Sequence, residues 1–239
     1  MNLKLGCVTD TGNYRSKNQD RIMCSSKQVG DEVLAVTCIC DGIGSFKDSE
    51  IAAEMMTNGI KNWFDGIVKY YPQVMDKKEL IEDLEITIRE LNELICEYRE
   101  EKQNDIGCTM SLMLMIDFDY YIFHVGDSRI YCVRDELLQL TRDEVIMKLV
   151  NGKEKKLLAN YVGKNKALAI CKRNGTGQAG DVYISGSDGL YKCLVYEDVC
   201  DLSERLQTNK IAEEACRELI QLVLERGETD NISCSIIRV

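Results

Sequence analysis

The chain has 239 residues, a hydrophobic content of 45% and a formal net charge of −10. This length suits one large domain with one sizeable core, residues 1–239, better than two domains. The acidic balance argues against a nucleic-acid surface, which relies on clustered lysine and arginine. Because no apolar run reaches the ~20 residues that cross a bilayer and no secretory signal is present, we expect a cytoplasmic protein without a membrane partner.

The cysteine and histidine content restricts the metal chemistry. The twelve cysteines, without a secretory signal, are expected to be reduced and buried thiols. The sequence contains no Cys-x-x-Cys pair, and His124 is the only histidine. This composition disfavours a zinc site.

The first hundred residues predict strands followed by two helices. Strands are expected at Leu3–Thr9, Arg21–Ser26 and Val33–Cys40. The third strand is apolar on both faces, which indicates burial between two layers. Apolar residues at helical spacing then predict one helix from Asp48 to Phe64 and another over Lys78–Lys102.

From Gly107 onward the pattern predicts strands, with one more helix near the C-terminus. Strands are expected at Cys108–Ile116, Tyr120–Val125, Ile130–Val133, Leu137–Thr141, Asp181–Ser187 and Ile232–Val239. The amphipathic helix is expected over Asn209–Arg226, with its inward side chains at Ile211, Ala215, Leu219, Leu222 and Val223.

Three segments between these elements carry weaker patterns. Val145–Val150 is interpreted as a short helix, and Asn151–Gly180 as a loop with an intermittent strand near Ala167–Cys171. Leu190–Thr208 shows a mixed pattern. A strand–helix order followed by many strands indicates two antiparallel sheets packed face to face with helices outside.

Five carboxylates recur at the ends of predicted strands. Asp41, Asp127 and Asp188 each follow a strand, whereas Asp20 and Asp230 each precede one. In antiparallel sheets the end of one strand lies beside the start of its neighbour, so all five can meet at one edge. Taken alone, each Asp-Gly pair is an ordinary turn.

Converging carboxylates would repel one another unless cations neutralise them. Their pKa values would rise or split without such partners. Hard divalent ions favour oxygen ligands, and a pair of them that shares a carboxylate is suited to hydrolysing phosphate esters. The carboxylate set therefore favours a two-ion site at the sheet edge.

Seven short motifs carry a family resemblance. These motifs are Asn13–Asp20, Asp41–Gly44, Gly107–Thr109, Val125–Arg129, Gln139–Thr141, Ser187–Leu190 and Asp230–Ile232. Together they resemble the motif set of the metal-dependent, type 2C (PPM) serine/threonine protein phosphatases, and they occur in the order that is typical of this family. The resemblance is greatest to bacterial members. The resemblance spans almost the whole chain. It implies an α-β-β-α sandwich with two antiparallel sheets and a metal centre at one edge.

The resemblance also implies roles for particular residues. Asp41 corresponds to the carboxylate that bridges two Mg²⁺ or Mn²⁺ ions, with the Gly42 carbonyl as a further ligand. Asp188 and Asp230 correspond to ligands of the first ion, and Asp20 to a carboxylate that holds the second ion through water. Asp127 matches the position that contributes, with Asp188, to a third and looser ion in bacterial members.

Arg15 resembles the family's phosphate-binding arginine. From the residues alone it is a solvated charge, but a guanidinium fork can grip two phosphate oxygens at once. The implied reaction is direct attack on phosphorus by a hydroxide that bridges the two ions, without a phosphoenzyme. Arg15 and the ions would then stabilise the charge on the equatorial oxygens.

The donor of the leaving-group proton stays open at the sequence level. Eukaryotic relatives carry a histidine just after the bridging Asp-Gly, but here this position is Ile43. Either a metal-bound water donates the proton or the step relies on charge stabilisation. His124 is three residues before Asp127 but is interpreted as a structural residue on a strand. Gln19 replaces a frequent glutamate.

The favoured hypothesis is a phosphatase that acts on phosphoserine and phosphothreonine in proteins and counters a cognate kinase. We expect a monomer. The alternative is a non-catalytic phosphatase-like module that binds partners through the same surface. A metal-dependent phosphodiesterase is a third possibility, which the acidic charge disfavours. The segment from Thr141 to Gly163 is short for the family, and it covers the flap beside the active site.

Overall fold

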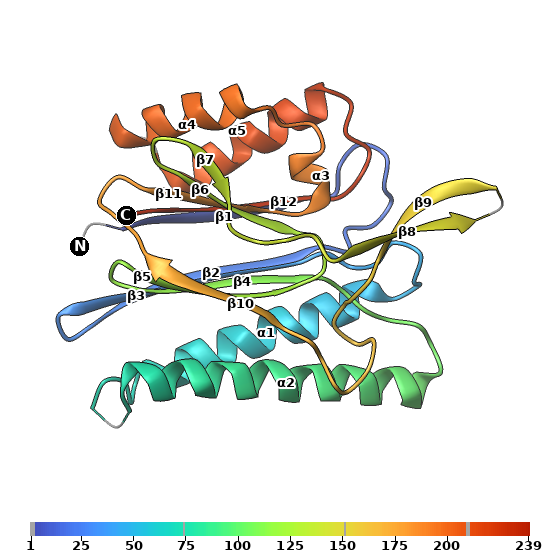
Figure 1. Cartoon of the computed structure of the whole chain (residues 1–239), viewed down its shortest axis with the longest axis horizontal. Coiled ribbons are helices and arrows are strands. Elements are labelled where there is room, and N and C mark those ends of the chain that lie inside the picture. The colour runs from blue at the N-terminus through green and yellow to red at the C-terminus, as the bar shows by residue number, and fades with distance from the viewer. Residues whose placement is uncertain (1–2, 74, 151, 209–210) are drawn as a thin grey trace.

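Two antiparallel sheets face each other and helices cover their outer faces, so the protein has four layers (Figure 1). The computed structural model describes residues 3–73, 75–150, 152–208 and 211–239. This arrangement confirms the predicted α-β-β-α sandwich. No helix among the described residues is long and apolar enough to cross a membrane.

Each large sheet has five strands, and every pairing within it is antiparallel. The first sheet has the order β1 (Lys4–Asp10), β12 (Ile232–Arg238), β11 (Val182–Gly186), β6 (Arg129–Val133) and β7 (Leu137–Gln139). The second has the order β10 (Cys171–Thr176), β5 (Asp119–Val125), β4 (Met110–Ile116), β3 (Glu32–Cys40) and β2 (Arg21–Val29). A separate two-stranded sheet pairs β8 (Val145–Val150) with β9 (Lys153–Leu158).

The helices form two groups, one on each outer face. α1 (Ser49–Ile67) and α2 (Lys77–Lys102) cover the second sheet. α2 begins with a capping box, in which the Asp76 side chain accepts from the Glu79 amide and Glu79 accepts from the Asp76 amide. α3 (Asp188–Tyr191), α4 (Tyr196–Thr208) and α5 (Ala212–Glu225) lie on the side of the first sheet.

Apolar side chains fill all three spaces between these layers. β3 contributes to two of them, because Leu34, Val36 and Cys38 face the helices while Ala35 faces the other sheet. This explains why the strand is apolar on both faces. All twelve cysteines are free thiols, but Cys171 is exposed and four others are only partly buried, contrary to the expectation that all are buried.

Several sequence-based expectations were wrong. Val145–Val150 is a strand, because it pairs with Lys153–Leu158 instead of covering a core as a helix would. The strand expected near Ala167–Cys171 begins only at Cys171, where it pairs with β5.

The C-terminal third also differs from the expectation. The mixed segment Leu190–Thr208 contains the end of α3 and all of α4. Ile211 is not turned inward: it precedes α5 as its N-cap and is 60% exposed, and Leu222 is only partly buried. Residues 209–210 of the expected helix lie outside the described residues.

Strand register places the chemically important segments at one edge of the sandwich. Arg21 pairs with Cys40, which puts the residues just before β2 beside those just after β3. Gly186 pairs with both Arg129 and Cys234, which joins the end of β11 to the starts of β6 and β12. The Ser233 hydroxyl of β12 donates to Asp20, just before β2, so the loops that carry all five carboxylates leave the two sheets at the same edge.

Candidate active site

A cavity of about 560 Å³ opens at this edge of the sandwich. Its lining includes six of the seven residues that the sequence analysis singled out: Arg15, Asp41, Gly42, Asp127, Asp188 and Asp230. The seventh, Asp20, is only 1% exposed and interacts electrostatically with Asp41 and Asp188. The structure therefore brings together residues that are up to 215 positions apart in the chain.

The half-buried Asp41 and the buried Asp20 form the inner part of the site. The Asp41 amide donates to the Thr109 hydroxyl at 3.0 Å, and its carbonyl accepts from the Thr109 amide at 2.8 Å, which continues the β3–β4 pairing past the strand end. Asp20 accepts from the Ser233 hydroxyl at 2.8 Å. These contacts fix the loop backbone at Asp41 and the side chain of Asp20.

The electrostatics of this pair are unfavourable for two negative charges. Burial, followed by the charges of Asp20, Asp188, Asp127 and Asp230, raises the pKa of Asp41 well above its ordinary value. Burial also raises the pKa of Asp20 to about 6, although hydrogen bonds from Ser233 and Ser187 oppose this rise. Among the described residues, no lysine or arginine forms an ion pair with either carboxylate.

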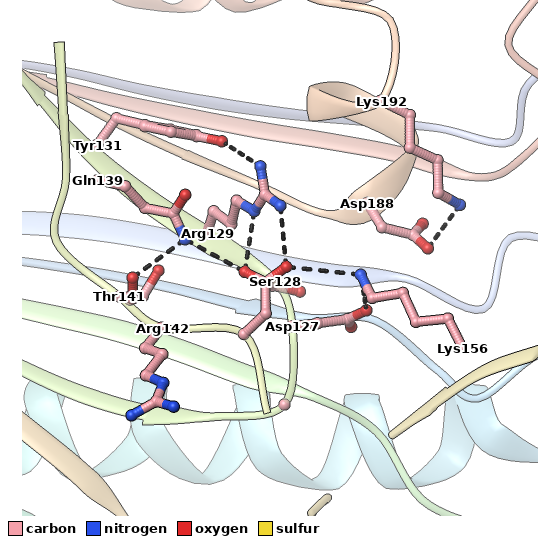
Figure 2. A network of polar contacts seen from close by, with 12 residues as sticks. Asp127, Ser128, Arg129, Tyr131, Gln139, Thr141, Arg142, Lys156, Asp188 and Lys192 are labelled. Atoms are coloured by element: carbon pink, nitrogen blue, oxygen red, sulfur yellow. Dashed lines mark hydrogen bonds and ion pairs between the residues drawn. The ribbon is translucent and has the colours of Figure 1, made fainter. Parts of the chain in front are cut away.

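The three outer carboxylates each contact a basic side chain. Lys192 lies 2.6 Å from Asp188, and Lys156 lies 3.3 Å from Asp127 (Figure 2). Arg15 contacts Asp230 through Nη2 at 3.0 Å. The basic side chains therefore neutralise the rim of the cavity, whereas Asp41 and Asp20 beneath it have no such partner in the described chain.

This donor set fits hard divalent cations. It consists of carboxylate and carbonyl oxygens, and burial together with four neighbouring carboxylates disfavours the charged form of Asp41 and raises its pKa, which a cation would reverse. Within the described residues, no three metal-binding side chains already converge on one point. A bound ion would therefore compete with Lys192 for Asp188 and with Arg15 for Asp230.

Asn231 holds the loop that carries Arg15 and Asp20. Its Oδ1 accepts from the Gln19 amide at 2.9 Å, and its Nδ2 donates to the carbonyls of Thr11 and Lys17 at 2.8 and 3.0 Å. Gly12 has a φ of +77°, and a Cβ there would lie 2.4 Å from the Asp230 carbonyl oxygen. The loop thus packs directly on the backbone of the segment that contains Asp230.

A second set of contacts fixes the loop that carries Asp127. Nε2 of the buried His124 lies 3.0 Å from the Gly126 carbonyl and 3.1 Å from the Arg142 carbonyl, so this nitrogen bears the proton and donates. Glu144 accepts from the Gly126 amide at 2.9 Å. His124 does not line the cavity, and burial lowers its pKa. It positions Gly126 and Asp127, which agrees with its interpretation as a structural residue.

Replacing His124 with phenylalanine should lower the free energy of unfolding by about 3 kcal/mol, because buried carbonyls and the Ser111 hydroxyl, 2.9 Å from Nδ1, lose their partner. His124→Gln, which keeps one donor, should lose less. Because burial lowers the pKa of His124, the stability that this residue contributes should fall as the pH drops below ~6.5, where the unfolded histidine takes up a proton, so the loss in His124→Phe should be smaller at pH 5.5 than at pH 7.5. Urea titrations at pH 5.5 and 7.5 test both points, and equal losses in the two variants would contradict the hydrogen-bond account.

Two lysines in the cavity wall were not among the residues predicted from the sequence. Lys192 lies four residues after Asp188, a spacing at which side chains on a helix pair. This contact could have been predicted only if α3 had been recognised as a helix. Lys156 lies on β9, in the segment that was interpreted as a loop. Arg129, on β6, forms a bidentate pair with Asp143, with each bond at 2.9 Å. The motif Val125–Arg129 contains this residue but does not predict the pair.

Comparisons with known proteins identify the family to which the chain is similar. A model of the family described as protein phosphatase 2C matches residues 13–151, which is more than half of the chain. The chain is 27% identical over 256 residues to a putative protein phosphatase 2C-type from Streptococcus pyogenes, and the match covers 98% of this chain and 97% of that protein.

Two further comparisons concern the serine/threonine protein phosphatase PstP. The Mycobacterium tuberculosis protein is 26% identical over 252 residues, a match that covers 99% of this chain but only 45% of that relative. The crystal structure of the PstP catalytic domain in complex with two manganese ions has a TM-score of 0.76 and 22% identity, and the match covers 99% of this chain and 97% of that one. Because the family match spans more than half of the sequence and the solved structure shares the fold, the chain belongs to the protein phosphatase 2C family.

Proposed function

We propose that this chain is a metal-dependent protein phosphatase that hydrolyses phosphoserine and phosphothreonine. The observation that carries the proposal is the pair of half-buried Asp41 and buried Asp20, which has no cationic partner among the described residues, at a cavity that Arg15 borders. Family membership supports the reaction class, and the two manganese ions of the PstP structure support divalent metal dependence.

The carboxylates would hold two Mg²⁺ or Mn²⁺ ions. Asp41 would be shared by the two ions and Gly42 would add its carbonyl oxygen. Asp188 and Asp230 would help to hold one ion, and Asp20 would help to hold the other through water. Asp127 and Asp188 would hold a third, looser ion. When bound, such ions lower the pKa of water and withdraw negative charge from a phosphoryl group.

Arg15 would bind the phosphoryl group of the substrate. Its side chain is 45% exposed at the cavity rim, so it can exchange Asp230 for phosphate oxygens without desolvating a buried charge. Freed from Asp188 and Asp127, Lys192 and Lys156 would add positive charge on the cavity wall. Ile43 also lines the cavity and cannot donate a proton, so the leaving alkoxide depends on charge stabilisation or on water.

The biological setting is part of the proposal. The substrates would be phosphoproteins made by a serine/threonine kinase, and residues 1–239 would act as one cytoplasmic, monomeric domain. The twelve free thiols support a reducing compartment, and the β1–β12 pairing, which joins the two ends of the chain, supports one folding unit. The chain spans 45% of the length of the mycobacterial relative, so the setting of that protein does not transfer directly.

The proposed activity is tested with p-nitrophenyl phosphate and phosphothreonine peptides. The purified protein should hydrolyse both with Mn²⁺ or Mg²⁺, lose all turnover in EDTA and regain it when the metal is added back. A protein that binds Mn²⁺ and phosphopeptides without turnover would instead be the non-catalytic phosphatase-like module. Absence of Mn²⁺-dependent turnover on both substrates would exclude the enzyme.

A further inference from the structure

The hairpin of β8 and β9, here called the β8–β9 arm, projects from the sandwich beside the candidate active site (Figure 1). It forms its own two-stranded sheet and has no third strand among the described residues. Lys156, Leu157 and Leu158 of β9 line the cavity. Any chain that enters the cavity with a phosphorylated residue therefore passes beside this arm.

The arm leaves large apolar side chains in solvent. Ile146, Met147 and Leu149 are 50%, 62% and 70% exposed, and Leu157 is 38% exposed. A two-stranded hairpin is at best marginally stable alone, and exposed apolar patches mark interaction surfaces. Lys156 ties β9 to Asp127 and Asp143 at 3.3 and 3.5 Å. At the base of the arm, the Ala159 amide donates to the Glu144 carbonyl at 2.7 Å and the Asn160 amide group donates to the Glu144 carboxylate at 3.0 Å.

The charge of the arm is opposite to that of the whole protein. Residues 145–158 contain four lysines and one glutamate, in a chain with a net charge of −10. Lys148 and Lys155 lie directly opposite each other in the hairpin register, and neither forms an ion pair within the described part of the chain. Like charges in such a cross-strand pair are destabilising, and an anionic partner would offset the repulsion.

We propose that the β8–β9 arm is a docking surface for acidic segments that flank the phosphorylated residue in the protein substrate. The inference rests on the proposed phosphatase function and names the substrate class of the same site. Six extended residues span ~20 Å, so the arm would contact positions within about six residues of the phosphate. Lys148 and Lys155 would pair with carboxylates, while Ile146 and Leu157, a cross-strand pair beside them, would pack on apolar neighbours.

The position of the arm favours a substrate segment over a second copy of the chain. A second copy docked here would cover the cavity that the arm lines. A substrate segment enters that cavity itself, and its acidic residues would be attracted to a basic arm on an otherwise acidic protein. The open outer edges of β8 and β9 additionally offer unpaired backbone groups to an extended peptide.

The test compares Lys148→Glu/Lys155→Glu with the wild-type protein. The matched control is Lys69→Glu/Lys78→Glu, which makes the same charge change near the α1–α2 connection, at the opposite end of the molecule from the arm (Figure 1). The substrates are p-nitrophenyl phosphate and two phosphothreonine peptides of equal length, flanked by Glu and Leu or by Lys and Leu.

We expect the wild-type protein to have a higher kcat/KM on the acidic peptide than on the basic one. In the arm variant, kcat/KM on the acidic peptide should fall about tenfold through a higher KM, because two ion pairs become repulsive. Turnover of p-nitrophenyl phosphate should stay within twofold, and the control variant should behave as wild type. Fluorescence anisotropy of the labelled acidic peptide in EDTA should show the same loss of affinity without turnover.

Three results would each overturn the docking inference. These are an unchanged peptide preference in the arm variant, an equal loss of kcat/KM in the control variant, and dimers in light scattering that depend on the arm. Failure of the phosphatase proposal has a different signature. In that case no substrate would turn over with Mn²⁺, while the anisotropy measurement would still report whether the arm binds the acidic peptide.

Discussion

Replacing Asp41 with asparagine should lower kcat on p-nitrophenyl phosphate by at least ~10³-fold at saturating Mn²⁺. Asp41 is the carboxylate at the base of the cavity, and the charges of the four other carboxylates all act on it. An amide cannot supply the negative charge that would hold two cations in one site. Steady-state kinetics and calorimetric titration with Mn²⁺ measure the two losses, and activity within tenfold of wild type would contradict the role of Asp41.

The same substitution should stabilise the metal-free protein. Because burial and neighbouring carboxylates raise the pKa of Asp41 in the folded state, the charged carboxylate opposes folding. This contribution to stability is present below the unfolded pKa of ~3.9 and is lost as the pH rises through the higher folded pKa. In EDTA, the Asp41→Asn variant should therefore melt above wild type by a margin that grows between pH 5 and pH 8.

Differential scanning calorimetry of both proteins across this pH range tests the sign. Taking the difference between the variant and wild type removes the contribution of His124, which acts in the opposite direction at low pH. With saturating Mn²⁺ the order should reverse, because only the wild-type site gains the full stabilisation of metal binding. A variant that melts below wild type in EDTA would show that Asp41 stabilises the fold without metal.

Replacing Arg15 with alanine should lower kcat/KM by about 10²-fold, the loss expected when one charged donor to the transferring phosphoryl group is removed. Inhibition by inorganic phosphate should weaken as well, because the same guanidinium would bind the product. Arg15→Lys should recover only part of both effects, since an ammonium group lacks the bidentate fork.

Lys47→Ala provides a matched control for Arg15. Lys47 is exposed in the segment that follows Gly44, and no hydrogen bond or ion pair joins it to another described residue. Its removal should leave kcat/KM and phosphate inhibition unchanged. Equal phosphate inhibition of wild type and Arg15→Ala would exclude Arg15 from the phosphate site.

Much of the fold follows from local patterns in the sequence. The continuous apolar run of β3 predicted a strand covered on both faces, and burial in two apolar layers explains it. Strand ends marked by Asp41, Asp127 and Asp188 predicted a shared edge, because antiparallel pairing leaves few alternatives. The β8–β9 arm was missed since its strands alternate weakly and cover no core, so hydrophobic periodicity carries little signal there.

The carboxylates that gather at the sheet edge could be named from the sequence, because aspartate-glycine turns after apolar strands are local features. Their basic partners could not. Lys192 required α3, Lys156 required the β9 register, and the Arg15–Asp230 contact joins opposite ends of the chain. Charge pairing at this site depends on distances between segments that are remote in sequence, and only the tertiary structure decides those distances.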